Sequence, residues 1–159
     1  MKRTSTIFLQ AVIVLIGIVA LVILIRLPLT EGRAANLDLF SIYADPLILY
    51  GYASSIAFFI ALYKAFRLLG YIGQNRVFSS NSVATLKSIK YCAIVLGILI
   101  LGAGVYIRIF HSKEDDPAGF IAICIVTTFA SVVVATVAAI FEKILQNAID
   151  IKFENDLTI

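Results

Sequence analysis

The sequence predicts an all-α integral membrane protein in which four transmembrane helices form an antiparallel bundle and the fourth extends into the cytoplasm. The chain has 159 residues, of which 61% are hydrophobic and 14% are charged. That leaves too few polar side chains to cover the surface of a soluble domain. The chain also contains four apolar runs, each long enough to cross the roughly 30 Å hydrocarbon core of a bilayer. Its charged residues gather in the connections between these runs.

The first expected helix covers about residues 6–27. Lys2 and Arg3 precede it, and a basic start followed by an apolar run also describes a signal peptide. The apolar run is longer than the core of a typical signal peptide, so we assign it to the membrane. Arg26 marks the far interface, and Pro28 is expected to end the helix because proline disrupts helical hydrogen bonding.

The second expected helix covers about residues 46–72. Asp45 and Pro46 predict its start. An aspartate before a helix accepts hydrogen bonds from free helical amides, and a proline at the first helical position has no N–H that would need an acceptor. Gly73 follows the run and is expected to terminate it, since glycine readily adopts the left-handed conformation that ends many helices.

The third expected helix covers about residues 82–110, and Ser79, Ser80 and Asn81 all suit its N-cap. The fourth covers about residues 117–152. Neither glycine nor proline interrupts its second half, and apolar residues recur there at helical spacing. The pattern therefore predicts an amphipathic extension beyond the membrane, with an apolar stripe formed by Ile140, Ile144, Ala148 and Ile151.

The distribution of basic residues predicts the orientation of the chain. The stretch from Tyr63 to Lys90 contains five basic residues and no acidic one, and short loops rich in Lys and Arg stay in the cytoplasm. With both termini in the cytoplasm, the inner segments hold nine basic residues and the outer segments four. The nine are Lys2, Arg3, Lys64, Arg67, Arg76, Lys87, Lys90, Lys143 and Lys152.

Small residues predict where the helices approach one another, because association within lipid depends on close packing. Such residues occupy every fourth position in the second and fourth expected helices, and the third contains four of them as well. They are Ala53, Ala57, Ala61 and Ala65 in the second, Ala93, Gly97, Gly102 and Gly104 in the third, and Thr127, Ser131, Ala135 and Ala139 in the fourth. The stripes leave open whether the partner helix belongs to the same chain or to another copy. Cys92 and Cys124 are expected to lie at different depths, as free packing residues.

Tyrosines are expected to form belts at the two membrane interfaces, where their rings are favoured. Tyr43, Tyr50, Tyr52 and Tyr106 would lie at the outer one, and Tyr63, Tyr71 and Tyr91 at the inner one.

The sequence offers little support for catalysis. The membrane-spanning parts of the four helices, residues 7–25, 47–63, 91–107 and 120–141, contain no ionisable residue other than Cys and Tyr. Carriers and proton pathways, by contrast, place charged residues deep in the membrane. His111 lies beside three acidic residues, but we interpret this segment as a solvated loop rather than a metal site. We therefore expect no enzyme activity, no cofactor and no metal. A pore lined by Thr and Ser in an oligomer remains an alternative.

Two segments are distinctive: the run from Val77 to Ile89, VFSSNSVATLKSI, and the closing run from Lys152 to Ile159, KFENDLTI. Both resemble segments of the bacterial membrane-protein family known as domain of unknown function 2975. The family has no established activity. Its members are often encoded beside a small helix-turn-helix regulator, so the resemblance implies a partner in transcriptional regulation and a place in the bacterial inner membrane.

We therefore hypothesise a non-enzymatic regulatory or adaptor protein that binds a small cytosolic partner, without binding nucleic acid itself. The polar residues of the basic turn and of the acidic tail lie on the same expected side of the membrane, where opposite charges can pair. The candidate partner-binding residues are Phe78, Ser79, Asn81, Lys87, Lys90, Lys152, Glu154, Asn155, Asp156, Leu157 and Thr158. Two alternatives stay open: an oligomeric channel or small-solute exporter, and a structural subunit of a larger membrane complex.

Overall fold

The computed structural model describes residues 3–30, 38–110 and 118–156, and almost all of them are helical. The helices are α1 (Arg3–Thr30), α2 (Leu39–Tyr43), α3 (Pro46–Gly73), α4 (Ser80–Phe110) and α5 (Ala118–Asp156). All but the short α2 contain a segment long and apolar enough to cross a membrane. The predicted all-α class with four membrane-length helices is therefore confirmed. The short α2 was not predicted, because its five residues fall within an expected loop.

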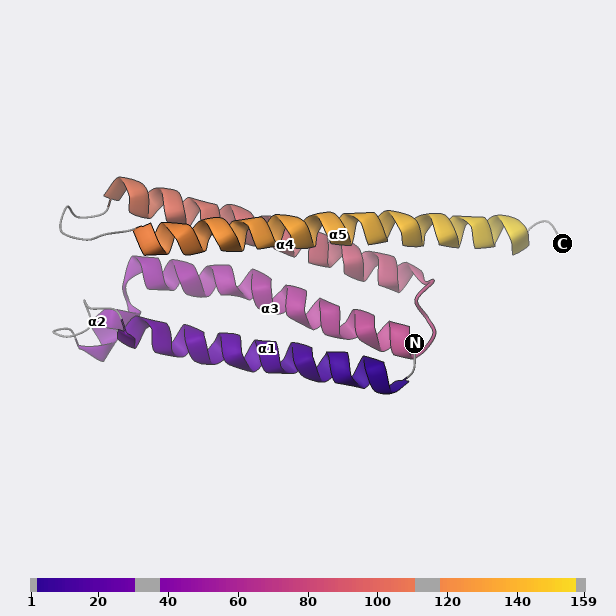
Figure 1. Cartoon of the computed structure of the whole chain (residues 1–159), viewed down its shortest axis with the longest axis horizontal. Helices are drawn as coiled ribbons and strands as arrows, with labels where there is room; N and C mark the ends of the chain where they lie inside the picture. Colours follow the sequence, from indigo (N-terminus) through magenta and orange to yellow (C-terminus); the bar gives the residue numbers. More distant parts are fainter. Residues whose placement is uncertain (1–2, 31–37, 111–117, 157–159) are drawn as a thin grey trace.

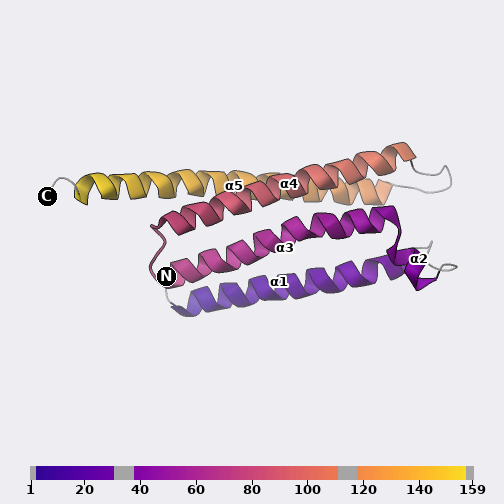
Figure 2. The same cartoon turned by 180° about the vertical axis from the view of Figure 1, so that it is seen from behind.

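The four long helices lie side by side in chain order, and each runs antiparallel to its neighbour (Figures 1 and 2). The most extensive packing joins α4 to α5, followed by α3 to α4 and then α1 to α3. A groove of about 510 Å³ lies between the two end helices, lined by Ala20 of α1 and Val134 of α5 and floored by α3 and α4. The helices therefore form an open row.

Two ends of the molecule are distinguished below. The start of α1, the turn between α3 and α4, and the end of α5 lie at one end, called the termini end (Figure 1). The short α2 lies at the opposite end (Figure 1).

The predicted start of α3 is confirmed in atomic detail. The side chain of Asp45 accepts a hydrogen bond from the backbone amide of Leu47 at 2.8 Å, and Pro46 occupies the first helical position. A carboxylate at this position also interacts favourably with the positive end of the helix dipole.

Helix α3 ends close to the predicted position, but the role predicted for Gly73 in ending it is wrong. Gly73 is the last helical residue, and it is Asn75 that takes the left-handed conformation, with φ of 56°. Asparagine tolerates this conformation better than most residues. Gly73 has a different role, because a Cβ atom at that position would lie 3.0 Å from Cγ2 of Thr6 on α1. Its small size permits α1 and α3 to approach.

The prediction that Pro28 ends the first helix is also wrong, since α1 continues to Thr30 with Pro28 inside it. A proline at this position leaves the carbonyl of residue 24, four residues earlier, without its usual amide donor. The hydroxyl of Tyr52 on α3 donates to the carbonyl of Leu24 at 3.2 Å. A neighbouring helix thus supplies the missing donor, which is a known way for membrane helices to tolerate proline.

Small residues set the distance between α4 and α5, as the stripes predicted. A Cβ atom at Gly97 would lie 3.4 Å from Cβ of Ser131, and one at Gly104 would lie 3.3 Å from Cβ of Cys124. Ala93 on the same face of α4 is only 5% exposed. Cys92 and Cys124 are both free, as expected.

Three of the tyrosines expected in the outer belt join helices together. Tyr50 donates from its hydroxyl to the carbonyl of Leu99 on α4 at 2.8 Å, and a Cβ atom at Gly102 would lie 3.2 Å from that hydroxyl oxygen. Tyr43 donates to the carbonyl of Ile25 at 3.1 Å. Together with Tyr52, they hold the end of the molecule near α2 through hydrogen bonds to neighbouring backbones.

The bond between Tyr52 and Leu24 gives a first prediction. Replacing Tyr52 with Phe should lower the free energy of unfolding by about 0.5–1.5 kcal/mol, because a buried carbonyl loses its donor. The same replacement should cost less in a Pro28→Ala background, where the amide of residue 28 can bond to Leu24 instead. Unfolding of the four variants in detergent measures both effects. Equal costs in the two backgrounds would contradict this account of α1.

Candidate functional site

The turn between α3 and α4 is held in place by a cluster of serine hydroxyl groups. Ser79 precedes α4, and its Oγ accepts a hydrogen bond from the amide of Ser82 at 3.3 Å. The hydroxyls of Ser79 and Ser82 both donate to the carbonyl of Arg76, at 2.9 Å and 3.2 Å. The Ser82 side chain is fully buried. Of the three predicted N-cap candidates, Ser79 is therefore the one that caps α4. The hydrogen bonds of Ser79 and Ser82 also hold the turn in a defined conformation.

The surface of this turn, called the turn patch, consists of Phe78, Ser79, Asn81, Lys87 and Lys90. Phe78 is 63% exposed, and the side chains of Asn81 and Lys87 also lie open to solvent. Arg76, next to the patch, is exposed as well. No acidic residue lies anywhere between Tyr63 and Lys90 in the sequence, so the patch combines an exposed aromatic ring with an excess of positive charge.

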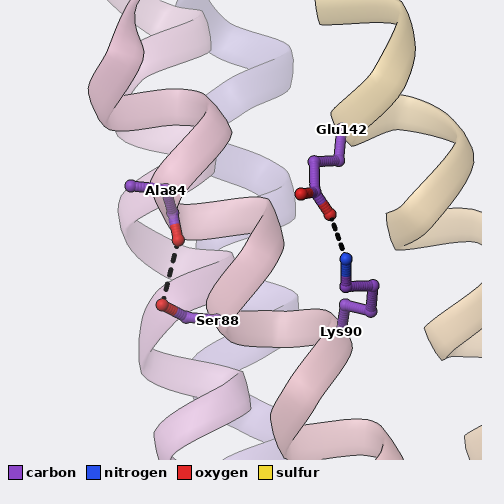
Figure 3. Close-up of polar contacts among 4 residues, drawn as sticks. All are labelled: Ala84, Ser88, Lys90 and Glu142. Atoms are coloured by element: carbon purple, nitrogen blue, oxygen red, sulfur yellow. Dashed lines mark hydrogen bonds and ion pairs between the residues drawn. The ribbon is translucent and has the colours of Figure 1, made fainter. Parts of the chain in front are cut away.

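Lys90 joins the turn patch to α5. Its Nζ donates a hydrogen bond to Oε2 of Glu142 at 2.6 Å, and the two side chains are 21% and 19% exposed. Figure 3 shows Lys90 reaching from α4 across to Glu142 on α5, while Ser88 turns back to the carbonyl of Ala84 on its own helix. The ammonium group also lies 5.1 Å from the centre of the Tyr91 ring. The sequence predicted that charges of opposite sign would pair at this end, and this contact confirms it.

The last turns of α5 form the second part of the predicted site, called the α5 tip and comprising residues 150–156. The helix continues past the turn between α3 and α4, so its end projects from the row (Figures 1 and 2). Residues 150–155 are all exposed. Ile151 and Phe153 are 60% and 67% exposed despite being apolar. The α5 tip thus exposes both apolar and charged side chains.

The structure places the two parts of the predicted site at the same end of the molecule without bringing them together. Lys90 and Glu142 lie where α4 and α5 still pack on each other, whereas Lys152, Glu154 and Asn155 lie on the projecting tip. Asp156 is the last residue of α5. The predicted residues Leu157 and Thr158 lie outside the described residues.

Two residues with clear structural roles were not among the predicted site residues. Glu142 belongs to the acidic side chains that follow the fourth apolar run and was not a candidate site residue, although it forms the ion pair with Lys90. Gln10 donates from its side-chain amide to the carbonyl of Phe66 at 3.3 Å and so links α1 to α3. The signal for Gln10 was available, because it is the only amide side chain in the first apolar run.

The segment containing His111 lies outside the described residues. Within the described part of the chain, no group of His, Cys, Asp and Glu is arranged to hold a metal ion.

Comparisons with known proteins point to a single family. The family model described as "Protein of unknown function (DUF2975)" matches residues 28–159. A curated relative, "Uncharacterized membrane protein YoaS" from Bacillus subtilis (strain 168), is 45% identical over 161 residues, and the match covers 100% of both chains. No solved structure matches the chain significantly.

The ion pair between α4 and α5 gives a second prediction. Replacing Glu142 with Gln should lower the midpoint of thermal unfolding by a few degrees, because Lys90 then keeps its charge without a charged partner. Exchanging the pair, with Lys90→Glu and Glu142→Lys together, should restore much of the loss. Lys87→Gln is the matched control and should have little effect, since Lys87 is exposed. Equal effects of the single and exchanged variants would show that the pair contributes nothing.

Proposed function

This chain belongs to the family described as "Protein of unknown function (DUF2975)", and from that premise we propose that it is a regulatory or adaptor protein of a bacterial cytoplasmic membrane. Its termini end faces the cytoplasm and binds a small cytosolic protein through the turn patch and the α5 tip. It acts by binding and performs no catalysis. The resemblance of the chain to its family makes a small helix-turn-helix regulator the first candidate partner.

The observation that carries this proposal is the turn patch itself. Phe78 is a large apolar side chain that is 63% exposed, on a turn that the Ser79 and Ser82 hydrogen bonds already hold in one conformation. Exposed aromatic residues on a preorganised surface are typical anchors of protein interfaces, because little conformational entropy is lost on binding. In the membrane orientation proposed here this ring faces water, so a partner gains apolar contact by covering it.

Charge indicates the chemistry of the partner. Lys87 of the turn patch and the neighbouring Arg76 present exposed positive charge, whereas the charge of Lys90 is paired with Glu142. A partner that docks there presents acidic groups around an apolar pocket for Phe78. The α5 tip provides a second point of contact, so a partner that reaches both parts gains affinity from the pair without needing either contact to be strong.

The orientation follows from the same charges. Lys and Arg are excluded from translocated short loops, and the segments that the sequence assigns to the cytoplasm hold nine basic residues against four in the outer segments. The ion pair between Lys90 and Glu142 then lies near the inner membrane interface, since charged side chains are costly in hydrocarbon.

A labelling experiment tests the orientation. In a variant without Cys92 and Cys124, a cysteine introduced at Asn75 should react with a membrane-impermeant maleimide only after the cells are permeabilised. A cysteine at Phe40, which is 85% exposed on α2 at the opposite end, is the matched control and should react in intact cells. Labelling of the Asn75 site in intact cells would show that the orientation is the opposite one, and the proposed surface would then not face the cytosol.

A pull-down with quantitative mass spectrometry tests the partner surface. Replacing Phe78 with Ala should weaken recovery of the cytosolic partner by about ten-fold or more, as expected when an interface anchor is truncated. Removing residues 154–159 should also reduce recovery. Phe110→Ala is the matched control, because Phe110 is 69% exposed at the opposite end, and it should leave recovery unchanged. Equal recovery from all variants would contradict the proposed surface.

A further inference from the structure

Helix α5 carries two apolar seams with coiled-coil spacing, and only one of them is packed within the chain. Residues that alternate at steps of three and four lie along one side of a helix and meet a partner helix. The first seam shows what such a pattern does in this molecule. It consists of Ser131, Ala135, Ala138, Glu142, Leu145 and Ile149.

The first seam packs against α4. Ser131, Ala135, Ala138 and Leu145 are each at most 8% exposed, and Glu142 forms the ion pair with Lys90. The packing extends from the membrane-spanning part of α5 to the level of the turn patch. A helix in this molecule thus covers the seam from Ser131 to Leu145.

The second seam has the same spacing and lies on an adjacent face of α5. It consists of Thr127, Ala130, Val134, Val137, Phe141, Ile144, Ala148 and Ile151. Val134, Val137 and Phe141 are 48%, 45% and 52% exposed, and Ile144 and Ile151 are 54% and 60% exposed. Ile144 and Ile151 also belong to the apolar stripe predicted for the extension, and the structure shows that this stripe faces away from α4.

The second seam is continuous across two environments. Its first residues, Thr127, Ala130 and Val134, line the groove between α1 and α5, within the apolar part of the chain. Its last residues lie beyond Glu142, the level at which charged side chains appear on α5. Apolar side chains in lipid need no cover. With the inner membrane interface placed near Lys90 and Glu142, as proposed above, Ile144 and Ile151 lie in water, where burial of apolar surface is favourable.

These features restrict what can cover the second seam. The occupant must be apolar along the groove and must continue past Glu142 with an apolar stripe of its own. An acyl chain fills the groove but ends at the membrane interface. A helix that does both is more than a membrane span in length, and α5 itself, with 39 residues and therefore about 58 Å of length, is such a helix.

We propose that the second seam of α5 packs against the same seam of a second copy of this chain. The result is a parallel dimer with two-fold symmetry, in which each α5 lies in the groove between α1 and α5 of its partner. Such an interface is self-complementary, since the same residues face one another across the axis. This inference does not rest on the cytosolic partner proposed above.

Disulfide cross-linking in membranes tests the geometry of the dimer. In a variant without Cys92 and Cys124, cysteines at Ile144 or Ile151 should give cross-linked dimers on mild oxidation, because equivalent seam positions lie close together in a parallel pair. A cysteine at Phe153 is the matched control: it is 67% exposed on the same tip but lies off the seam. Absence of cross-links at the seam positions, or equal cross-linking at Phe153, would overturn the proposal.

The mass of the protein in lipid nanodiscs tests the energetics independently. The natural chain should give a dimer, and the double variant Ile144→Glu and Ile151→Glu should lose it, whereas Phe153→Glu should keep it. Both substituted sites are exposed in the single chain, so the midpoint of thermal unfolding of detergent-solubilised monomer reports whether folding is intact. A natural chain that is monomeric, or that binds a different membrane protein in place of its copy, would overturn the proposal.

Discussion

The close approach of α4 and α5 is the constraint on which the rest of the structure depends. Lipid tails are as apolar as leucine, so two membrane helices gain little from burying apolar side chains and must associate by contact between their backbones. A Cβ atom added at Gly97 would lie 3.4 Å from Cβ of Ser131, and one added at Gly104 would lie 3.3 Å from Cβ of Cys124, so the two helices are already in close contact at both glycines. Lys90 and Glu142 extend the contact toward the termini end. The turn patch is thereby fixed relative to the α5 tip.

The α1 side of the row is held by a different kind of interaction. Gly73 and Thr6 are in close contact at one end, and between the ends Gln10 donates to the backbone of α3. At the other end Tyr52 donates to the carbonyl that Pro28 leaves free. Side-chain donors thus join α1 to α3 where close packing is sparse, and the outer face of α1 remains apolar and exposed.

Local sequence signals predicted the elements, and long-range contacts decided what they missed. Asp45 with Pro46 predicts a helix start because both effects act within a few residues. The end of α1 could not be predicted this way, since the consequence of Pro28 depends on Tyr52 on another helix. Gly73 was assigned to helix termination although its small size is needed for Thr6. The sequence predicted that basic and acidic residues could pair at this end. It could not identify Glu142 as the partner of Lys90, because that depends on the register of α5 against α4.

The second seam shares Ile151 with the α5 tip but contains no residue of the turn patch, so the two proposals overlap only at the tip. The first seam directs one face of α5 toward α4, and α4 begins at the turn patch. The second seam lies on the adjacent face, toward the groove and α1. A second copy that covers this seam therefore leaves Phe78 and Lys87 uncovered. A dimer of this form presents two turn patches on one side of the membrane, so a cytosolic partner that is itself two-fold symmetric would bind both at once and more tightly than either alone.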